Sequence, residues 1–327
     1  MATTFTIYLP EHAPPGAVDA AVEAVESLEG LEQRWTVYDA ASEVSRINAA
    51  AGTRPVRVSH ATASIIRRAI EISDATAGAF DITAGPLVDA WGFSLRRGGM
   101  PDDAAIEAAR ASVNFRDVCV DVDERTVELR RRGMKINLGG IGKGAAVDRL
   151  ASRMRESGVE DFLIHGGGSS VYAAGDQNPP DDDASVSAPP STAEEANRRA
   201  DLVIDPQTPN PRGWRVDIAH PTRSGASVGS FWVRNSAVGT SGSGKRFFHY
   251  RGRRYGHVID PRTGRPAGDW SQVTVITPHA ADADALGTAM FVLGDAPRPP
   301  GFDPPPHAVL PADPKPDQPL HWRSLPS

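Results

Sequence analysis

The sequence predicts an α+β fold, in which helices pack on mixed or antiparallel sheets. Stretches with apolar residues at helical spacing are interspersed with pairs of short alternating segments joined by turns. Single strands do not alternate strictly with single helices, as they would in a doubly wound sheet. The chain has 327 residues, of which 40% are hydrophobic and 23% charged, so it is long enough to bury a substantial core.

The first part of the chain is predicted to be mainly helical. A short strand at 5–10 is followed by one long amphipathic helix over 16–38, which is predicted by apolar residues at helical spacing. These residues are Val18, Val22, Val25, Leu28 and Leu31. Ser42 and Ser59 are good N-cap residues, so a helix is expected after each, and Pro101 with two acids after it predicts a further helix start.

The second part is predicted to be mainly strands, with a helix over 142–159 and another over 279–294. The strands are expected at 117–122, 126–131, 134–139, 161–165, 169–175, 213–220, 227–233, 236–241, 246–252, 254–260 and 272–278.

The predicted organisation is one domain over 1–294, interrupted by an insertion, and a C-terminal tail. Residues 176–211 are rich in Pro, Asp, Ser and Ala, which predicts a flexible insertion with at most a short helix at 191–201. The tail, 295–327, holds many prolines and almost no periodicity, and we expect it to lack regular structure.

Charge and apolar patterning exclude several classes of protein. The formal net charge of −6 argues against a general nucleic-acid binder. No apolar run approaches the roughly 20 residues that span a bilayer. The chain as given begins without a signal peptide, so we expect a cytoplasmic location, or export if a signal precedes residue 1. Cys119 is the only cysteine, which excludes an internal disulfide and a cysteine-based metal cluster.

The segment INLGGIGKGAAVD, residues 136–148, is a glycine-dense turn between a predicted strand and a helix. Such a turn lets the backbone approach a ligand and directs N–H groups and the helix dipole at it, which suits a phosphate. A tight connection with no ligand is the alternative. It is not a Walker loop, because Gly144 follows Lys143 where Ser or Thr is required.

The segment GHVIDPRTGRP, residues 256–266, contains a histidine beside a carboxylate, His257 and Asp260. Such a histidine can move a proton near neutral pH. A lone histidine on a strand is more often structural, so both interpretations stay open at this point.

The final helix carries Asp284 and Thr288 one turn apart on a face that otherwise looks apolar. The hydroxyl could bond back to the i−4 carbonyl, but a carboxylate in a core costs several kcal/mol unless it is paired or binds a cation. Two oxygen ligands one turn apart suit a hard ion such as Mg²⁺ or Ca²⁺, whereas the ligand spacing for zinc is absent. Asp282 is expected to point elsewhere and to be solvated.

Together with FDITAGPLVDAWGF at 80–93, these segments resemble the FAD:protein FMN transferase (ApbE) family in the right order over about 1–294. The matching segments are Met1–Thr3, Phe80–Leu87 with Trp91–Phe93, Leu138–Gly144 with Asp148, Gly167–Gly168, Thr240–Gly242, His257–Pro266 and Asp284–Ala289.

The resemblance implies a T-fold-like α+β structure and a Mg²⁺-dependent reaction. FMN would be transferred from FAD to a threonine hydroxyl of an acceptor flavoprotein, with release of AMP. Two alternatives stay open: an FAD pyrophosphatase that gives FMN and AMP, and a flavin-binding protein without catalysis. No Ser-Gly-Ala-Thr acceptor motif occurs in this chain, so the acceptor is expected to be another protein.

The resemblance also implies roles for individual residues. The metal ligands would be Asp284, Thr288 and the carbonyl of Gly142, with Asp284 also counted as catalytic. His257 would handle the acceptor proton and lie near FAD. The other residues implied to bind FAD are Met1, Asp81, Gly140, Lys143 and Thr240. One departure is Gly244, where the family usually has an aromatic residue.

Overall fold

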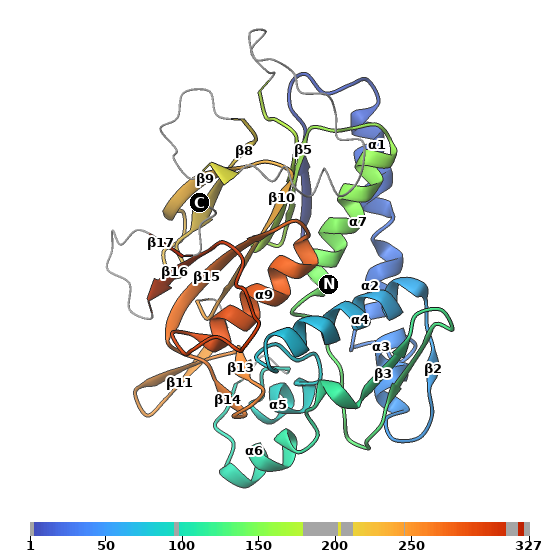
Figure 1. Cartoon of the computed structure of the whole chain (residues 1–327), viewed down its shortest axis with the longest axis vertical. Helices are drawn as coiled ribbons and strands as arrows, with labels where there is room; N and C mark the ends of the chain where they lie inside the picture. The colour runs from blue at the N-terminus through green and yellow to red at the C-terminus, as the bar shows by residue number, and fades with distance from the viewer. Residues whose placement is uncertain are drawn as a thin grey trace.

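The structure, a computed structural model, describes residues 3–94, 98–178, 202–203 (backbone only), 212–244, 246–311 and 320–323. Its centre is a seven-stranded sheet in which every neighbouring pair is antiparallel (Figure 1). In spatial order the strands are β1 (Phe5–Tyr8), β5 (Phe162–Gly166), β6 (Ser170–Ala174), β10 (Ser236–Gly242), β15 (Trp270–Thr277), β16 (His307–Pro311) and β17 (His321–Arg323).

Each face of this sheet is covered by a different layer. Helices α7 (Gly142–Glu156) and α9 (Ala280–Leu293) pack on one face and against each other. The other face packs its apolar side chains against a second, three-stranded antiparallel sheet. That sheet consists of β7 (Leu202–Val203), β9 (Ser227–Val233) and β8 (Trp214–Ala219).

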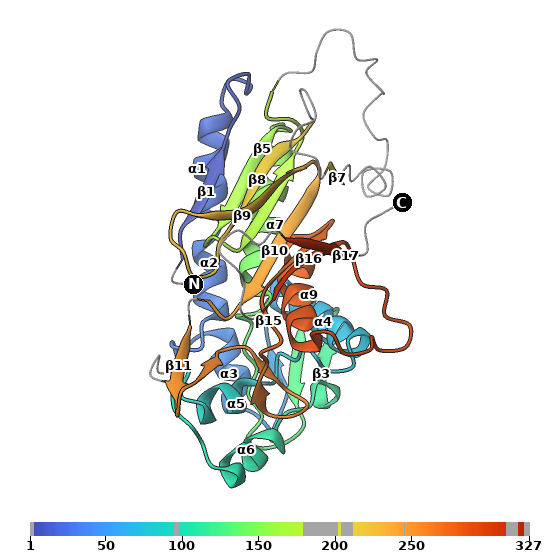
Figure 2. The same ribbon diagram turned by 90° about the vertical axis from the view of Figure 1, so that its left-hand side faces the viewer.

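Of the remaining helices, α1 (Ala17–Glu26) packs on α7 beside β1 and β5, and most of the others lie toward the other end of an elongated molecule (Figure 2). These others are α2 (Glu29–Trp35), α3 (Glu43–Ala49), α4 (His60–Ala75), α5 (Gly85–Ala90), α6 (Asp103–Arg110) and the 3₁₀ turn η1 (Phe115–Asp117). Small strands complete the fold: β2 (Val56–Arg57), β4 (Thr126–Leu129) and β3 (Val118–Asp121) in one sheet, and the hairpins β11 (Phe247–Tyr250) with β12 (Arg253–Gly256) and β13 (Ile259–Asp260) with β14 (Arg265–Pro266).

The predicted α+β class is confirmed, and the predicted helix starts are correct in detail. The Ser42 hydroxyl accepts a hydrogen bond from the backbone N–H of Ser45, and that of Ser59 accepts one from Thr62. In the part of the chain that the structure describes, no helix is long and apolar enough to cross a membrane.

The single long helix expected over 16–38 is wrong. Two helices, α1 and α2, occupy this stretch, and Val18 and Val22 are 67% and 54% exposed. The buried face of α1 consists instead of Ala17, Ala20 and Ala24. The small alanines lie on the side that packs against α7, and small side chains allow two helices to approach closely.

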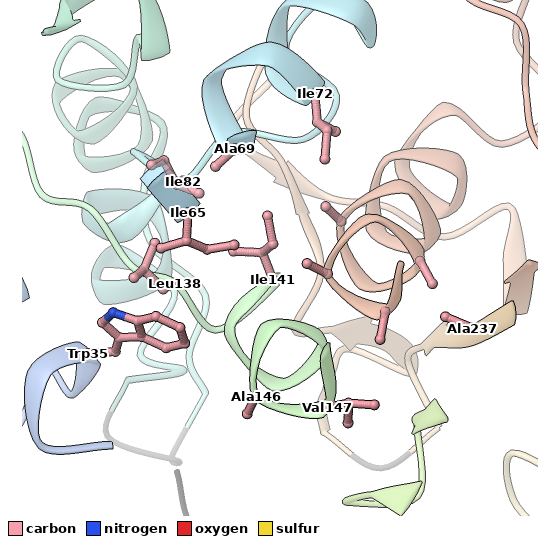
Figure 3. Close-up of a cluster of buried hydrophobic side chains, with 14 of the residues drawn as sticks. Trp35, Ile65, Ala69, Ile72, Ile82, Leu138, Ile141, Ala146, Val147 and Ala237 are labelled. Carbon is pink, nitrogen blue, oxygen red and sulfur yellow. The ribbon is translucent and has the colours of Figure 1, made fainter. Parts of the chain in front are cut away.

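The strand expected at 134–139 is also wrong. This segment makes only an isolated bridge, between Lys135 and Ala84, and Asn137 donates its N–H to the Ile82 carbonyl. Leu138 of this segment and Ile141, just after it, are buried in the main hydrophobic core, beside Trp35 and Ile65 (Figure 3). The glycine-rich turn is therefore anchored at both of its apolar positions.

The expectation that the proline-rich tail lacks regular structure is wrong as well, because β16 pairs with β15 along most of its length. The boundaries of the domain at 1–294 and of the tail at 295–327 stay predictions. The insertion predicted at 176–211 falls mostly outside the described residues, as does the short helix suggested at 191–201.

Candidate active site

Asp284 lies in the middle of α9, and its side chain is only 4% exposed. Its carboxylate accepts three hydrogen bonds: Oδ1 from the Ser170 hydroxyl at 2.6 Å, and Oδ2 from the Gly144 N–H at 2.8 Å and the Lys143 Nζ at 3.2 Å. The cost of burying the charge is thus offset by an ammonium and two neutral donors. The glycine-rich turn and the final helix, 140 residues apart in sequence, meet at this carboxylate.

The close approach of α7 to α9 requires a glycine at position 144. A Cβ on Gly144 would lie 2.0 Å from the Ala280 carbonyl oxygen, so no side chain fits there. The carboxylate of Asp148, one turn further along α7, accepts the N–H groups of Ala280 and Ala281 at 2.7 and 2.9 Å. Asp148 therefore caps α9 from another helix, and burial raises its pKa to about 6.

Thr288 lies one turn beyond Asp284. Its hydroxyl donates to the Asp284 carbonyl at 3.1 Å and lies 3.3 Å from the Ser241 hydroxyl of β10. Gly140 adjoins it, because a Cβ there would lie 3.8 Å from the Thr288 hydroxyl oxygen. The structure therefore brings Gly140, Lys143, Asp284 and Thr288 together. Gly142 is the first residue of α7, two residues before the Gly144 N–H that binds Asp284.

Two site residues were missed by the sequence analysis, Ser170 and Ser241. Both hydroxyls face α9 and touch Asp284 and Thr288 respectively. Ser241 lies within the Thr-Ser-Gly segment of a predicted strand. Because side chains alternate between the two faces of a strand, the sequence could have indicated that Ser241 and Thr240 point in opposite directions. In the structure the Thr240 side chain points to the opposite face of the sheet, where its hydroxyl lies 3.1 Å from that of Thr274.

His257 follows directly after β12. Its N–H donates to the Arg246 carbonyl at 3.1 Å, and its Nδ1 lies 3.3 Å from the same oxygen. Burial, together with the positive charges of Arg246 and Lys143, lowers the pKa of His257 to about 4, so the ring is neutral at pH 7. Arg254 of β12 donates to the Ser243 carbonyl, two residues after the Ser241 that touches Thr288, so β12 lies next to the segment that contacts α9.

Of the two other residues implied to bind FAD, Met1 lies outside the described residues. Thr3 nevertheless shows where the N-terminal segment runs: a Cβ on Gly167 would lie 2.1 Å from the Thr3 hydroxyl and 3.7 Å from the Lys143 side chain. Asp81 has its oxygens occupied by the N–H and hydroxyl of Thr83 and the N–H of Phe115. Burial raises the pKa of Asp81, which lines a cavity of about 150 Å³ together with Arg262.

The expectation that Asp282 is solvated is wrong. Its carboxylate forms a two-fold ion pair with the Arg68 guanidinium of α4, at 2.8 Å for each oxygen. This pair ties α9 to α4, so Asp282 has a structural partner that its place in the sequence did not reveal.

The donor set around Asp284 fits a hard divalent cation. A carboxylate offers about four acceptor positions, of which three are used, and the hydroxyl oxygens of Thr288 and Ser241 lie one helix turn further along. Among the residues described, no three His, Cys, Asp or Glu side chains gather to hold a metal. A cation here would be held by oxygen atoms of the protein together with oxygen atoms of a bound phosphate, which is the ligand set that Mg²⁺ usually has.

Comparison with known proteins gives a consistent result. The model of the ApbE family matches residues 1–298. An FAD:protein FMN transferase of Treponema pallidum is 33% identical over 293 residues, which cover 86% of this chain and 73% of that protein. One of Klebsiella pneumoniae is 30% identical over 291 residues, 87% and 73% of the two chains.

Solved structures agree with these relatives. The apo form of the Pseudomonas stutzeri flavinyl transferase ApbE superposes with a TM-score of 0.71 at 25% identity, over 90% of this chain and 83% of that one. The ApbE protein of Thermotoga maritima gives 0.72 at 25% identity, over 94% of each chain. The α+β fold and its relatives define this class of protein as a transferase that handles flavin. The chain belongs to the ApbE family.

Proposed function

We propose that this protein transfers FMN from FAD to a threonine hydroxyl of an acceptor flavoprotein, releases AMP, and depends on Mg²⁺. The observation that carries the proposal is the meeting of Lys143 and Gly144 with Asp284 and Thr288. The curated relatives named FAD:protein FMN transferase support the flavin chemistry.

Phosphoryl transfer depends more on positioning and charge neutralisation than on covalent catalysis. The ammonium of Lys143 and the N-terminus of α7 supply positive potential beside the glycine-rich turn, which suits a phosphate. Mg²⁺ held by Asp284, Thr288 and the Gly142 carbonyl would neutralise the charge that develops on the phosphates.

His257 is assigned to the acceptor's proton. The threonine oxygen forms a bond to the phosphorus of the FMN half, the bond from that phosphorus to the bridging oxygen breaks, and AMP leaves with the electron pair. The proton of the threonine goes to His257, which is neutral in the free protein and can accept it. The remaining residues proposed to hold FAD are Met1, Asp81 and Thr240. Asp81, which has internal partners, would act through the shape of the site, and Thr240, whose side chain faces the other side of the sheet, would act by fixing the strand that carries Ser241.

FAD hydrolysis is the second candidate, because water can take the place of the threonine hydroxyl at the same site. The observation that favours it is Gly244, where a Cβ would lie 2.3 Å from the Pro221 carbonyl oxygen. An aromatic side chain does not fit at this position, so the ring that the family usually has there is missing and cannot help to exclude water.

The test is incubation of the protein with FAD and Mg²⁺, with and without a flavoprotein domain that carries a Ser-Gly-Ala-Thr motif. AMP that appears only with the acceptor, together with an acceptor mass increased by one FMN, is the expected result. AMP without acceptor indicates the hydrolase, and FAD binding without AMP indicates a catalytically silent flavin-binding protein. A Thr→Val acceptor is the matched control, and flavinylation of that control would contradict the assignment of threonine.

A further inference from the structure

The hairpin formed by β11 and β12, residues 246–256, is hereafter called the basic hairpin. It projects from the body of the molecule (Figure 1). The chain has a net charge of −6, yet residues 218–259 contain no Asp or Glu and seven Lys or Arg. Five of these cations fall within residues 245–254. Positive charge is therefore concentrated on one small element of an acidic protein.

The arginines of the basic hairpin make hydrogen-bond and ring contacts but no ion pair within the described fold. Within the described residues, no carboxylate lies within ion-pair distance of Arg246, Arg251, Arg253 or Arg254. Arginines elsewhere on the surface commonly do have such partners, for example Arg265 with Asp103 at 2.6 Å. Unneutralised arginines on a single hairpin attract an acidic partner.

The two sides of the basic hairpin differ. On the inner side, the rings of Phe248 and Tyr255 stack with centroids 5.4 Å apart and pack against Trp91 and Phe93. Gly98 allows this packing, because a Cβ there would lie 2.6 Å from the Phe248 ring. These contacts hold the hairpin in place, so its charged side chains are presented from a fixed element.

Further aromatic rings are exposed among the arginines: Phe247 on the face opposite to Phe248, and Tyr250 at the end of β11 next to the turn. Phe247 and Tyr250 are 42% and 39% exposed. The Arg254 guanidinium lies 4.0 Å from the centre of the Phe247 ring, and that of Arg251 lies 5.3 Å from the Tyr250 ring. Aromatic and arginine side chains are the residues enriched where proteins bind one another.

The base of the basic hairpin adjoins the candidate active site. His257 follows β12 and donates its N–H to the Arg246 carbonyl, and its ring lies 6.4 Å from that of Phe93. A protein that presents a threonine to His257 would therefore lie against this hairpin.

From this placement we propose that the basic hairpin is the docking surface for the acceptor protein and binds an acidic surface around the acceptor threonine. The inference rests on the proposed function. A protein acceptor is favoured here, because the cations of the hairpin are interspersed with aromatic rings and the hairpin lies beside the residue assigned to the acceptor's proton.

The experiment compares the full-length protein with the double variant Arg251→Glu/Arg253→Glu. The acceptor is the flavoprotein domain with the Ser-Gly-Ala-Thr motif. We expect the KM for the acceptor to rise about tenfold at low salt, and the salt dependence of KM to decrease. The affinity for FAD, followed by flavin fluorescence, should be unchanged, because neither arginine belongs to the catalytic machinery. Arg57→Glu, an exposed arginine on β2, is the matched control and should leave KM unchanged.

The outcomes separate this inference from the proposed function. If the unmodified protein flavinylates no acceptor, the proposed function fails and the docking inference fails with it. If it flavinylates the acceptor and the double variant has the same KM as Arg57→Glu, only the docking inference is overturned. If the unmodified protein binds phosphatidylglycerol vesicles or RNA, and the double variant loses this binding but keeps the same KM for the acceptor, the docking inference is overturned in favour of that ligand. An acceptor whose acidic residues near the threonine are changed to lysine should partly restore the KM of the double variant, and this result would support the inference.

Discussion

The single residue Asp284 has a structural role, as a hydrogen-bond acceptor between elements, and a proposed chemical role, as a metal ligand. Its three internal hydrogen bonds explain how a carboxylate is tolerated inside a buried helix. The same bonds hold Lys143 and Ser170 at fixed positions beside it. Changes at this residue should therefore affect both turnover and stability, and the two effects can be separated.

Asp284→Ala is expected to lower turnover at least about 100-fold, because the proposed metal loses its only carboxylate. It should also destabilise the fold by about 1–3 kcal/mol, because the Ser170 hydroxyl and the Gly144 N–H lose a buried partner. Turnover is measured as AMP release across a Mg²⁺ titration, and stability by thermal unfolding.

The matched control is Asp284→Asn, which keeps the size of the side chain and one acceptor oxygen. Its melting temperature should lie closer to that of the unmodified protein, whereas its turnover should still require a far higher Mg²⁺ concentration. Full activity of Asp284→Ala at low Mg²⁺ would remove the proposed metal site.

His257 should give the activity an acid limb at an unusual pH. Its pKa in the free protein is about 4, below the ordinary value for histidine, so its neutral form persists as pH falls and is lost only near pH 4. The bound diphosphate of FAD should raise this pKa. The acid limb of kcat is therefore expected at higher pH than that of kcat/KM for FAD. The measurement is the pH profile of both constants, with unfolding checked at each pH.

His257→Gln should remove both limbs and lower kcat about 100-fold or more, a typical loss for a proton-transfer residue. A variant that retains the same acid limb shows that another group titrates.

At the scale of elements, the site depends on how α9 is held. Asp148 caps its start, Arg68 binds Asp282 in its first turn, and Gly144 allows α7 to touch it. Gly239 on β10 has the same role on the sheet side, because a Cβ there would lie 2.4 Å from the Ala283 carbonyl. Each contact fixes the distance from α9 to a neighbouring element.

Gly144→Ala should force α7 and α9 apart and destabilise the protein by about 1–3 kcal/mol or more, because the added methyl group meets backbone atoms that cannot move independently. Gly268→Ala is the matched control, since nothing lies within 4 Å of a Cβ at that position. Thermal unfolding of both variants measures the difference. Equal melting temperatures would show that the two helices are not as close as the structure places them.

At the scale of the whole molecule, the C-terminal segment completes the central sheet. All eight residues of β15 are buried, and β16 pairs along it. The domain boundary predicted at residue 294 would therefore leave the backbone groups of β15 exposed on one side, and an uncovered strand edge favours aggregation.

A chain shortened to 1–294 should aggregate or melt many degrees lower, whereas one shortened to 1–311 should keep a melting temperature within a few degrees of the full chain. The second keeps β16 and loses β17, whose residues are mostly exposed. Soluble yield and thermal unfolding are the measurements. A stable, active 1–294 chain would show that β16 contributes little.

The sequence was a good guide where a local signal carried the information. The caps at Ser42 and Ser59 and the motif positions Gly140, Lys143, Asp284 and Thr288 could be located without coordinates. It failed where two stripes of one helix were both apolar. In α1 the valines and the alanines each repeat at helical spacing, and only the close packing on α7 selects the alanines.

By itself, the sequence determined the α+β class, the family, and the residue types that gather at the candidate site, because turn glycines, caps and motif order are properties of neighbouring residues. Only the tertiary structure decided what pairs with Asp284 and Asp282, which face of the sheet Ser241 and Thr240 occupy, and that β16 extends the sheet. Those outcomes depend on contacts between segments far apart in the chain, and the free energy of burying a polar group depends on the partner that folding brings to it.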